Sequence, residues 1–238
     1  MQPNSNAMNY AADTHGAEHA TKAQEHAFLQ NIRCLERRSY IERYFLLSSA
    51  PILAGVKPSM LISFKHCCKS VWEELREQLE EAAGLCSIEL CQGENIFSLL
   101  IYSKELMQLR LSAPSSRLIL EQYGYPECED LENLLAFLAG RFRQCSFPHE
   151  IGVFLGYPPK DVQGFIEKNG KDFLCCRYWK VYHDEGCARE TFRDIDEAKA
   201  RAICLLRQKI PIQTAAKMLA ETKTSGNKIY TKRKGEIL

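Results

Sequence analysis

The fold is decided by residues 86–102, which read CSIELCQGENIFSLLIY. In the first half, Cys86, Ile88 and Leu90 alternate with Ser, Glu and Cys, the period of two that a half-buried β-strand shows. The Gln-Gly-Glu-Asn sequence at 92–95 is typical of a turn, and residues 96–102 return as a more apolar run. The stretch therefore predicts a β-hairpin whose second strand is the more deeply buried.

Before the hairpin, an apolar run at 41–47 is predicted to be helical, and it is followed by a strand and a further helix. Residues 60–64 form a short apolar run that indicates a strand. Ser70 and Glu73 have the spacing of a capping box, so a helix is expected to begin there. Gly84 is expected to end it, because glycine is common just after a helix. The apolar face of this helix is predicted to consist of Val71, Leu75 and Leu79.

After the hairpin the sequence becomes mainly helical. Leucines between 131 and 138 recur at the spacing of one helix face, and a long helix is predicted over residues 184–207. Residues 173–176 and 178–182 indicate one or two further short strands. Several strands are joined too closely for the crossovers of a parallel sheet. The sequence therefore predicts an α+β (mixed α/β) fold: a small sheet that includes the hairpin, flanking helices, and a helical hairpin within residues 148–169.

Composition limits the class of protein. Of the 238 residues, 45% are hydrophobic and 10% aromatic, enough for a substantial core. Lys and Arg number 31 against 30 Asp and Glu, so a net charge of +1 gives no global attraction to nucleic acid or membrane. Eleven cysteines, an odd number, are more typical of reduced thiols than of a disulfide framework. With no secretory leader and no apolar span, we expect a soluble, cytoplasmic protein with no membrane partner.

One globular domain is expected over residues 30–220. Residues 1–25 contain almost no large apolar side chain, so they are predicted to be a disordered tail. Residues 222–238 are polar and basic, and they are predicted to be a flexible tail.

The most distinctive segment is residues 147–167, FPHEIGVFLGYPPKDVQGFIE. A histidine and a glutamate adjoin near its start, and a tyrosine followed by two prolines lies at its middle. Aromatic residues and prolines in this arrangement favour a groove on a packed helical hairpin. The leading interpretation is therefore a binding module for a small molecule or a protein partner, centred on residues 147–182. Its candidate binding surface consists of His149, Glu150, Tyr157, Tyr178 and Trp179.

A second interpretation of this segment is a nucleic-acid-binding regulator. The apolar residues between 151 and 166 match helix-turn-helix positions, with Gly156 ending the first helix and Pro159 starting the second. Two acidic residues on the second helix offset its positive charge, and phosphate contacts need net positive charge, so nucleic acid is the less favoured partner. The residues that would face nucleic acid are Lys160, Gln163 and Lys168.

A third interpretation is a metal- or thiol-dependent enzyme that uses His149, because a neutral imidazole can act as general base or metal ligand. Adjacent helical residues point about 100° apart, so Glu150 cannot form a tight dyad with it. The other partners considered are Cys175, Cys176, Tyr178 and His183. No nucleotide-binding, zinc-protease or nucleophile-elbow motif occurs, and the cysteines lack the C-x2-C spacing of zinc sites, so the sequence indicates no metal and no particular cofactor.

The chain resembles an uncharacterised bacterial family, the domain of unknown function numbered 3793, which is found mostly in Gram-positive anaerobes. The resemblance is carried by HEIG through GFIE at 149–167, YWKVY at 178–182 and APILAG at 50–55, and it spans about residues 41–207. Relatives usually carry His-Cys where this chain has Ser48-Ser49. If a thiol there did chemistry in the family, this chain has lost it. The resemblance implies no particular activity.

Because residues 1–25 and 222–238 are predicted to be tails outside the domain, limited proteolysis should leave a core close to residues 30–220 with an unchanged melting temperature. The physical reason is that ordering either tail would cost about 1 kcal/mol or more of backbone entropy per residue, with little burial in return. Protection of a tail from protease, or a melting temperature several degrees lower after trimming, would show that the tail docks on the domain.

Overall fold

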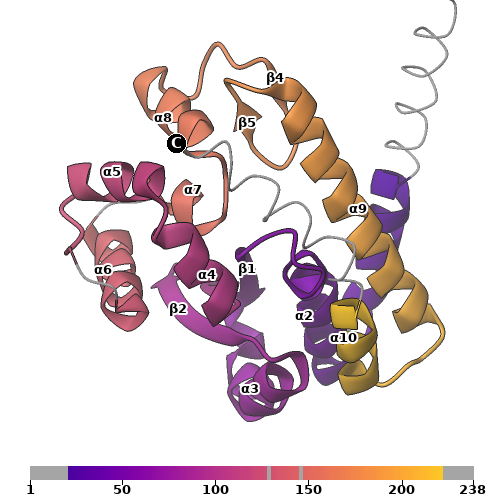
Figure 1. Cartoon of the computed structure of the whole chain (residues 1–238). Helices are drawn as coiled ribbons and strands as arrows, with labels where there is room; N and C mark the ends of the chain where they lie inside the picture. The colour runs from indigo at the N-terminus through magenta and orange to yellow at the C-terminus, as the bar shows by residue number, and fades with distance from the viewer. Residues whose placement is uncertain (1–20, 128–129, 145–146, 222–238) are drawn as a thin grey trace, which may run out of the picture.

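The structure is a computed structural model, and it describes residues 21–127, 130–144 and 147–221 (Figure 1). Helices predominate around two small sheets. In chain order the elements are α2 (Arg37–Leu53), β1 (Ser59–Lys65), the 3-10 helix η1 (His66–Cys68), α3 (Lys69–Ala83), β2 (Cys86–Gln92), β3 (Ile96–Tyr102), α4 (Lys104–Leu111), α5 (Pro114–Gln122), α6 (Leu131–Gln144), α7 (Ile151–Phe154), α8 (Pro159–Glu167), β4 (Cys175–Cys176), β5 (Lys180–Val181), α9 (Glu185–Arg207) and α10 (Ile212–Glu221).

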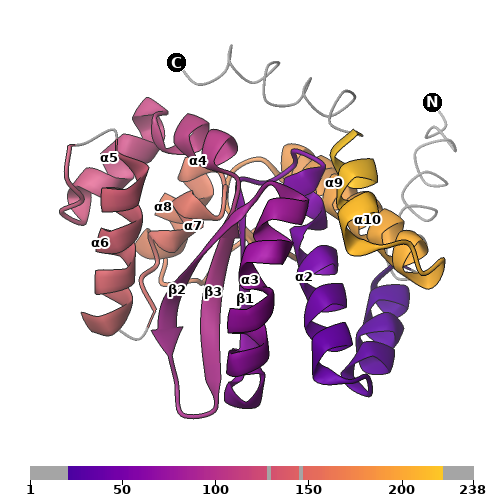
Figure 2. The same cartoon turned by 90° about the horizontal axis from the view of Figure 1, so that it is seen from below.

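The larger sheet has the strand order β1-β3-β2, and both of its pairings are antiparallel (Figure 2). β2 and β3 form the predicted hairpin, and β1 pairs with the other edge of β3 from Ser59 opposite Tyr102 to Lys65 opposite Ile96. A β-bulge lies between Glu89 and Cys91. The α+β fold predicted from the hairpin is thus confirmed.

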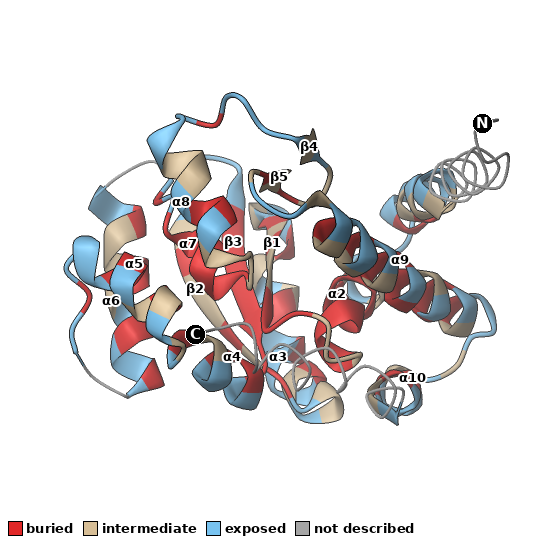
Figure 3. Cartoon of the chain, turned by 45° about the horizontal axis from the view of Figure 1, so that its top comes forward, coloured by how far each residue is buried: buried red, intermediate tan, exposed pale blue. Residues whose placement is uncertain are grey.

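The central strand β3 separates two hydrophobic cores. Phe97, Leu99 and Ile101 belong to the first core, together with residues of α2, α3, α9 and α10. Leu100 and Tyr102 point the other way, into the second core, which is built mainly from α4, α5, α6 and α7. Figure 3 shows the buried residues gathered on the sheet and on the inward sides of the helices. β3 is therefore buried on both faces.

A third, smaller core lies beside the two-stranded β4–β5 sheet. It consists of Trp179 and Val181 with Ala188, Phe192 and Ile195 from the first half of α9. The second half of α9 enters the first core and runs along α2 (Figure 1). Asp184 caps this helix by accepting a hydrogen bond from the backbone N–H of Cys187 at 2.9 Å. The long helix predicted at 184–207 is confirmed, and it joins the third core to the first.

The helix after β1 differs from its predicted start. α3 begins at Lys69 directly after η1, and its N-cap residue, Cys68, makes no side-chain capping bond, so the predicted capping box is wrong. The chain enters α3 from a turn that is already helical, which leaves no extended residue to act as the cap. Trp72, rather than Val71, is buried with the two leucines of this helix. Gly84 ends the helix as predicted.

The chain is already helical at residues 21–33. Phe28 and Ile32 of this helix are buried in the first core, and the Glu25 carboxylate lies 2.8 Å from the Lys199 Nζ. A domain boundary at residue 30 would therefore cut the helix and remove Phe28 from the first core, so trimming to residue 30 should lower the melting temperature, in contrast to the expectation from the sequence. The rest of the predicted N-terminal tail, 1–20, and the predicted C-terminal tail, 222–238, lie outside the described residues.

The distinctive segment contains α7 and α8, and α7 is only one turn long. Gly156 follows α7 with a φ of +75°, and a Cβ built there would lie 2.4 Å from Pro58 Cδ, so the turn requires glycine on both counts. Pro159 is the first residue of α8, where its missing N–H costs nothing. The predicted end of the first helix and start of the second therefore agree with the structure.

Replacing Gly164 of α8 with alanine should lower stability by about 1–3 kcal/mol, because the new Cβ would lie 2.7 Å from both Cβ and Cγ of Tyr182, which cannot swing away. The matched control is Gly140→Ala inside α6, where the nearest atom, 3.7 Å away, is the end of the flexible Arg143 side chain. The control should gain up to about 1 kcal/mol from helix propensity. Urea unfolding of both variants measures the difference, and equal effects would mean that α8 and the chain at Tyr182 are not tightly packed.

Candidate functional site

A cavity of about 260 Å³ lies between α7, α8 and the segment that contains β4 and β5. Its size is just below the range of about 300–1,000 Å³ that is usual for small-molecule sites. Its wall is mostly apolar, formed by Phe147, Ile151, Gly152, Leu155, Tyr157, Val162, Phe165, Tyr178 and Trp179. The polar or charged residues in the wall are His149, Asp161, Cys176, Arg177 and Lys180.

Stacked aromatic rings form one side of the cavity. The Tyr157 and Trp179 rings lie 5.1 Å apart at an interplanar angle of 26°, and Trp179 meets Phe192 of the third core edge-on at 4.5 Å. The Tyr157 hydroxyl donates to the backbone carbonyl of Tyr178 at 3.2 Å. Burial raises the pKa of Tyr157 to about 12, so the phenol remains a neutral donor at physiological pH.

Asp161 fixes the aromatic wall to α8. This carboxylate is 3% exposed, and one of its oxygens accepts the indole N–H of Trp179 at 2.8 Å. The other oxygen accepts the backbone N–H groups of Tyr182 and His183 at 2.8 and 3.0 Å. Three donors satisfy the buried charge. Asp161 therefore positions Trp179 and the end of β5.

Two cationic side chains in the wall differ in their partners. Arg177 pairs with the buried Asp196 of α9, and Asp196 also accepts the Tyr178 hydroxyl at 2.6 Å. Burial and that hydrogen bond raise the pKa of Tyr178. Lys180 donates to the backbone carbonyl of Gly170 at 2.7 Å and has no acidic partner in the described part of the chain. Within the residues that the structure describes, Arg177 is thus the one of these two cations that is neutralised.

Of the five residues proposed from the sequence as a binding surface, His149, Tyr157, Tyr178 and Trp179 line this one cavity. Glu150 does not. Its side chain is fully buried, and it accepts a hydrogen bond from Arg141 Nε of α6 at 2.8 Å. Glu150 therefore anchors the turn before α7 to α6, and its carboxylate is turned away from His149's cavity.

The histidine proposed for catalysis is exposed, in the turn that precedes α7. Its ring meets Phe165 edge-on at 5.1 Å. Of the partners considered for it, Cys176 and Tyr178 line the same cavity, whereas His183 hydrogen-bonds Lys160 at 3.2 Å. Burial raises the pKa of Cys175, which disfavours a reactive thiolate there. Within the described ranges, no three His, Cys, Asp or Glu side chains are grouped so that they could hold a metal ion.

The three residues proposed for nucleic-acid binding are exposed, on or just after α8. Each already contacts a neighbour: Lys160 bonds His183, Gln163 bonds Glu167 at 2.8 Å, and Lys168 Nζ lies 5.6 Å from the centre of the Tyr182 ring. Glu167 places a negative charge on the same surface. Nucleic-acid binding through this surface stays a prediction.

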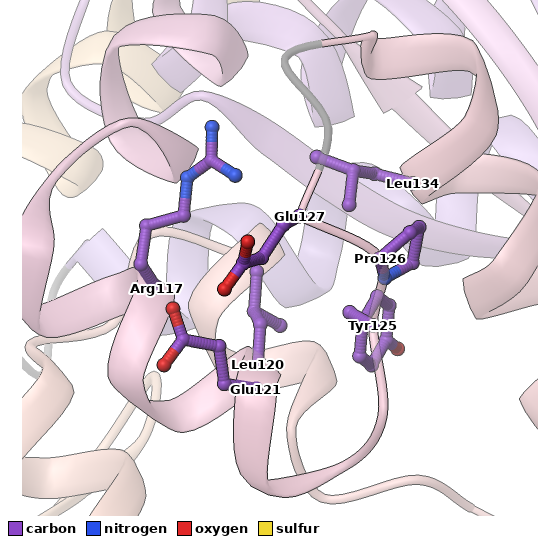
Figure 4. A pocket seen from close by; sticks show the side chains of 7 residues that line it. All are labelled: Arg117, Leu120, Glu121, Tyr125, Pro126, Glu127 and Leu134. Carbon is purple, nitrogen blue, oxygen red and sulfur yellow. The ribbon is translucent and has the colours of Figure 1, made fainter.

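A second hollow lies between α5 and α6, lined by residues that include Arg117, Tyr125 and Glu127 (Figure 4). Its volume is about 10 Å³, the space of roughly one water molecule. It is too small for an organic ligand.

A buried lysine lies behind the aromatic wall. Lys57, in the loop between α2 and β1, is 4% exposed, and its Nζ lies 4.9 Å from the centre of the Tyr157 ring. Burial, assisted by repulsion from Lys199, lowers the pKa of Lys57 to about 7. Ser48 and Ser49 are also buried but do not line the cavity.

Sequence reasoning missed several residues that build this site. The sequence interpretation used Asp161 only as a negative charge that offsets the lysines of α8. Its position in the first turn of that helix, where the helix dipole favours a carboxylate, was the available signal. Phe165 and Lys180 lie within the segments 147–167 and 178–182, which the sequence did single out. They come close to His149 only because α8 and β5 pack together. Nothing in the sequence marked Lys57 as buried.

The family described as "Protein of unknown function (DUF3793)" matches residues 45–216, which include every residue of the cavity wall. The chain belongs to this family. No curated protein matches the chain, and no solved structure matches it. Across the described residues, no helix of the DUF3793 chain combines the length and apolar character needed to cross a membrane.

Lys57→Met should be more stable than the wild type at neutral pH and should remove one component of its pH dependence. The unfolded lysine titrates near 10.5 and the folded one near 7, so the unfolded chain binds more protons between these values. The contribution of Lys57 to stability is therefore complete above the unfolded pKa and is lost as pH falls through the window, by about 1 kcal/mol per pH unit.

Urea unfolding at pH 6, 7, 8 and 9 measures this slope in the wild type, in Lys57→Met and in Lys171→Met, an exposed control. Only Lys57→Met should lose the slope. If its slope equals that of the control, Lys57 is protonated in the folded protein at these pH values.

Proposed function

We propose that this protein binds a small, mainly apolar molecule in the cavity between α7, α8 and β5. The observation that carries the proposal is the convergence of aromatic side chains from four separate segments of the chain on one hollow of about 260 Å³. Ligand sites are typically concave and mostly apolar, with a few fixed polar groups. A ligand with an aromatic ring suits this wall, because contacts between aromatic rings contribute about 0.5–1.5 kcal/mol beyond the area that they bury.

The rigidity of the wall supports the view that the cavity is a binding site and not a chance irregularity of the surface. Trp179 is held at its indole nitrogen by Asp161 and at its ring by Phe192, so its orientation is set before any ligand arrives. Preorganised side chains lose little conformational entropy on binding, which favours affinity. The Trp179 ring of the cavity wall is therefore already fixed in its orientation.

Tryptophan fluorescence offers a direct test. The protein has two tryptophans, and Trp72 is buried 5.7 Å from Phe64 in the first core, so Trp72→Phe leaves Trp179 as the reporter in the cavity. A library of small aromatic compounds should contain members that change Trp179 emission with saturation. Phe165→Ala should weaken that binding by about 1–2 kcal/mol through loss of ring contact. The exposed residue Leu118, which is not part of the cavity wall, provides the matched control Leu118→Ala, which should leave binding unchanged.

Alkylation of cysteine gives an independent readout. Cys176 is exposed in the cavity wall and Cys204 is exposed on α9, outside that wall. A bound compound should slow alkylation of Cys176 relative to Cys204, as followed by peptide mass spectrometry. The proposal fails if no compound alters either readout and native mass spectrometry of the purified protein finds no retained small molecule.

A further inference from the structure

Resting on the proposed small-molecule site, we propose that its ligand carries a carboxylate, which Lys180 and His149 bind beside the ring of Phe165. The first reason is the unbalanced charge of Lys180. Its ammonium has three N–H donors and gives one to the Gly170 carbonyl, and no carboxylate of the described chain pairs with it. An ammonium lining an apolar cavity without a counter-ion favours an anionic ligand.

The only acidic residue in the described cavity wall cannot serve as that counter-ion. Asp161 already accepts three hydrogen bonds, from the indole of Trp179 and from two backbone N–H groups, and both of its oxygens are engaged. Arg177, the other cation of the wall, is neutralised by Asp196. The charge that remains available to a ligand is therefore that of Lys180.

Phe165 brings Lys180 and His149 to the same part of the cavity. The Lys180 Nζ lies 5.7 Å from the centre of the Phe165 ring, and the imidazole lies 5.1 Å from it. A second ring, Phe173, lies 5.1 Å from the Lys180 Nζ. These contacts hold the ammonium over apolar rings, where water competes less for its hydrogen bonds. His149 adds a ring nitrogen donor, since within the described residues its side chain makes no hydrogen bond or ion pair.

The ligand class is therefore a small aromatic or alicyclic monocarboxylate. Its ring would lie against Tyr157 and Trp179, and its carboxylate would reach Lys180. The single positive charge of Lys180 matches the single negative charge of a carboxylate better than the charge of about −1.5 to −2 on a phosphate monoester. No covalent step is involved.

The test compares 2-naphthoate with its neutral isostere 2-naphthamide, using Trp179 emission of the full chain carrying Trp72→Phe at pH 7 and low salt. We expect naphthoate to bind about tenfold more tightly, the size of one charge-assisted hydrogen bond. Lys180→Met should abolish that preference, and Lys180→Arg should retain most of it. Lys171→Met, an exposed lysine outside the cavity wall, should keep the full preference. His149→Gln should reduce it by a few-fold.

The outcomes separate this inference from the proposed function. If acid and amide bind equally well to the wild type, the cavity binds ligands but the carboxylate assignment is wrong. If neither compound binds, the assigned ligand class is wrong, and the proposed function is decided separately by the compound library and native mass spectrometry. A preference that survives in Lys180→Met, with that variant shown by melting temperature to be folded, rules out Lys180 as the anion-binding residue.

Discussion

The fold depends on one strand, β3, whose two faces supply two different cores. Phe97, Leu99 and Ile101 point toward α2 and α3, whereas Leu100 and Tyr102 point toward the helices on the opposite side. Both outer strands take their register from this strand. A slip of one residue would exchange its two faces and disrupt both cores together. The seven residues of β3 thus place most of the helices, including those that carry the candidate site.

The candidate site has a smaller scaffold of its own. A sheet of two two-residue strands is not stable alone, so β4 and β5 must be held by their surroundings. Asp161 ties β5 to α8, and the third core ties it to α9. Because α9 continues into the first core, the cavity wall is connected to the main body of the protein through one helix as well as through α7.

The sequence predicted those elements whose pattern depends on near neighbours. The hairpin and α9 follow from alternation and helical spacing, which are local properties. The capping box failed because η1 continues directly into α3. The burial of charges beside the site could not be predicted, since Glu150 is buried against Arg141 of another helix and Lys57 against a ring one hundred residues away. Burial of this kind depends on contacts between distant segments, and no spacing in the sequence encodes it.

If the cavity binds a ligand as we propose, the close approach of α8 to Tyr182, which Gly164 permits, limits how ligand selectivity can change. The backbone on this side cannot move outward without losing the Asp161 bonds, and it cannot move inward because Gly164 already lies against the tyrosine. A cavity of different size or shape would have to arise by exchange of side chains on the other walls, at positions such as Phe147 or Ile151. Related proteins could thus accept different molecules on an unchanged backbone.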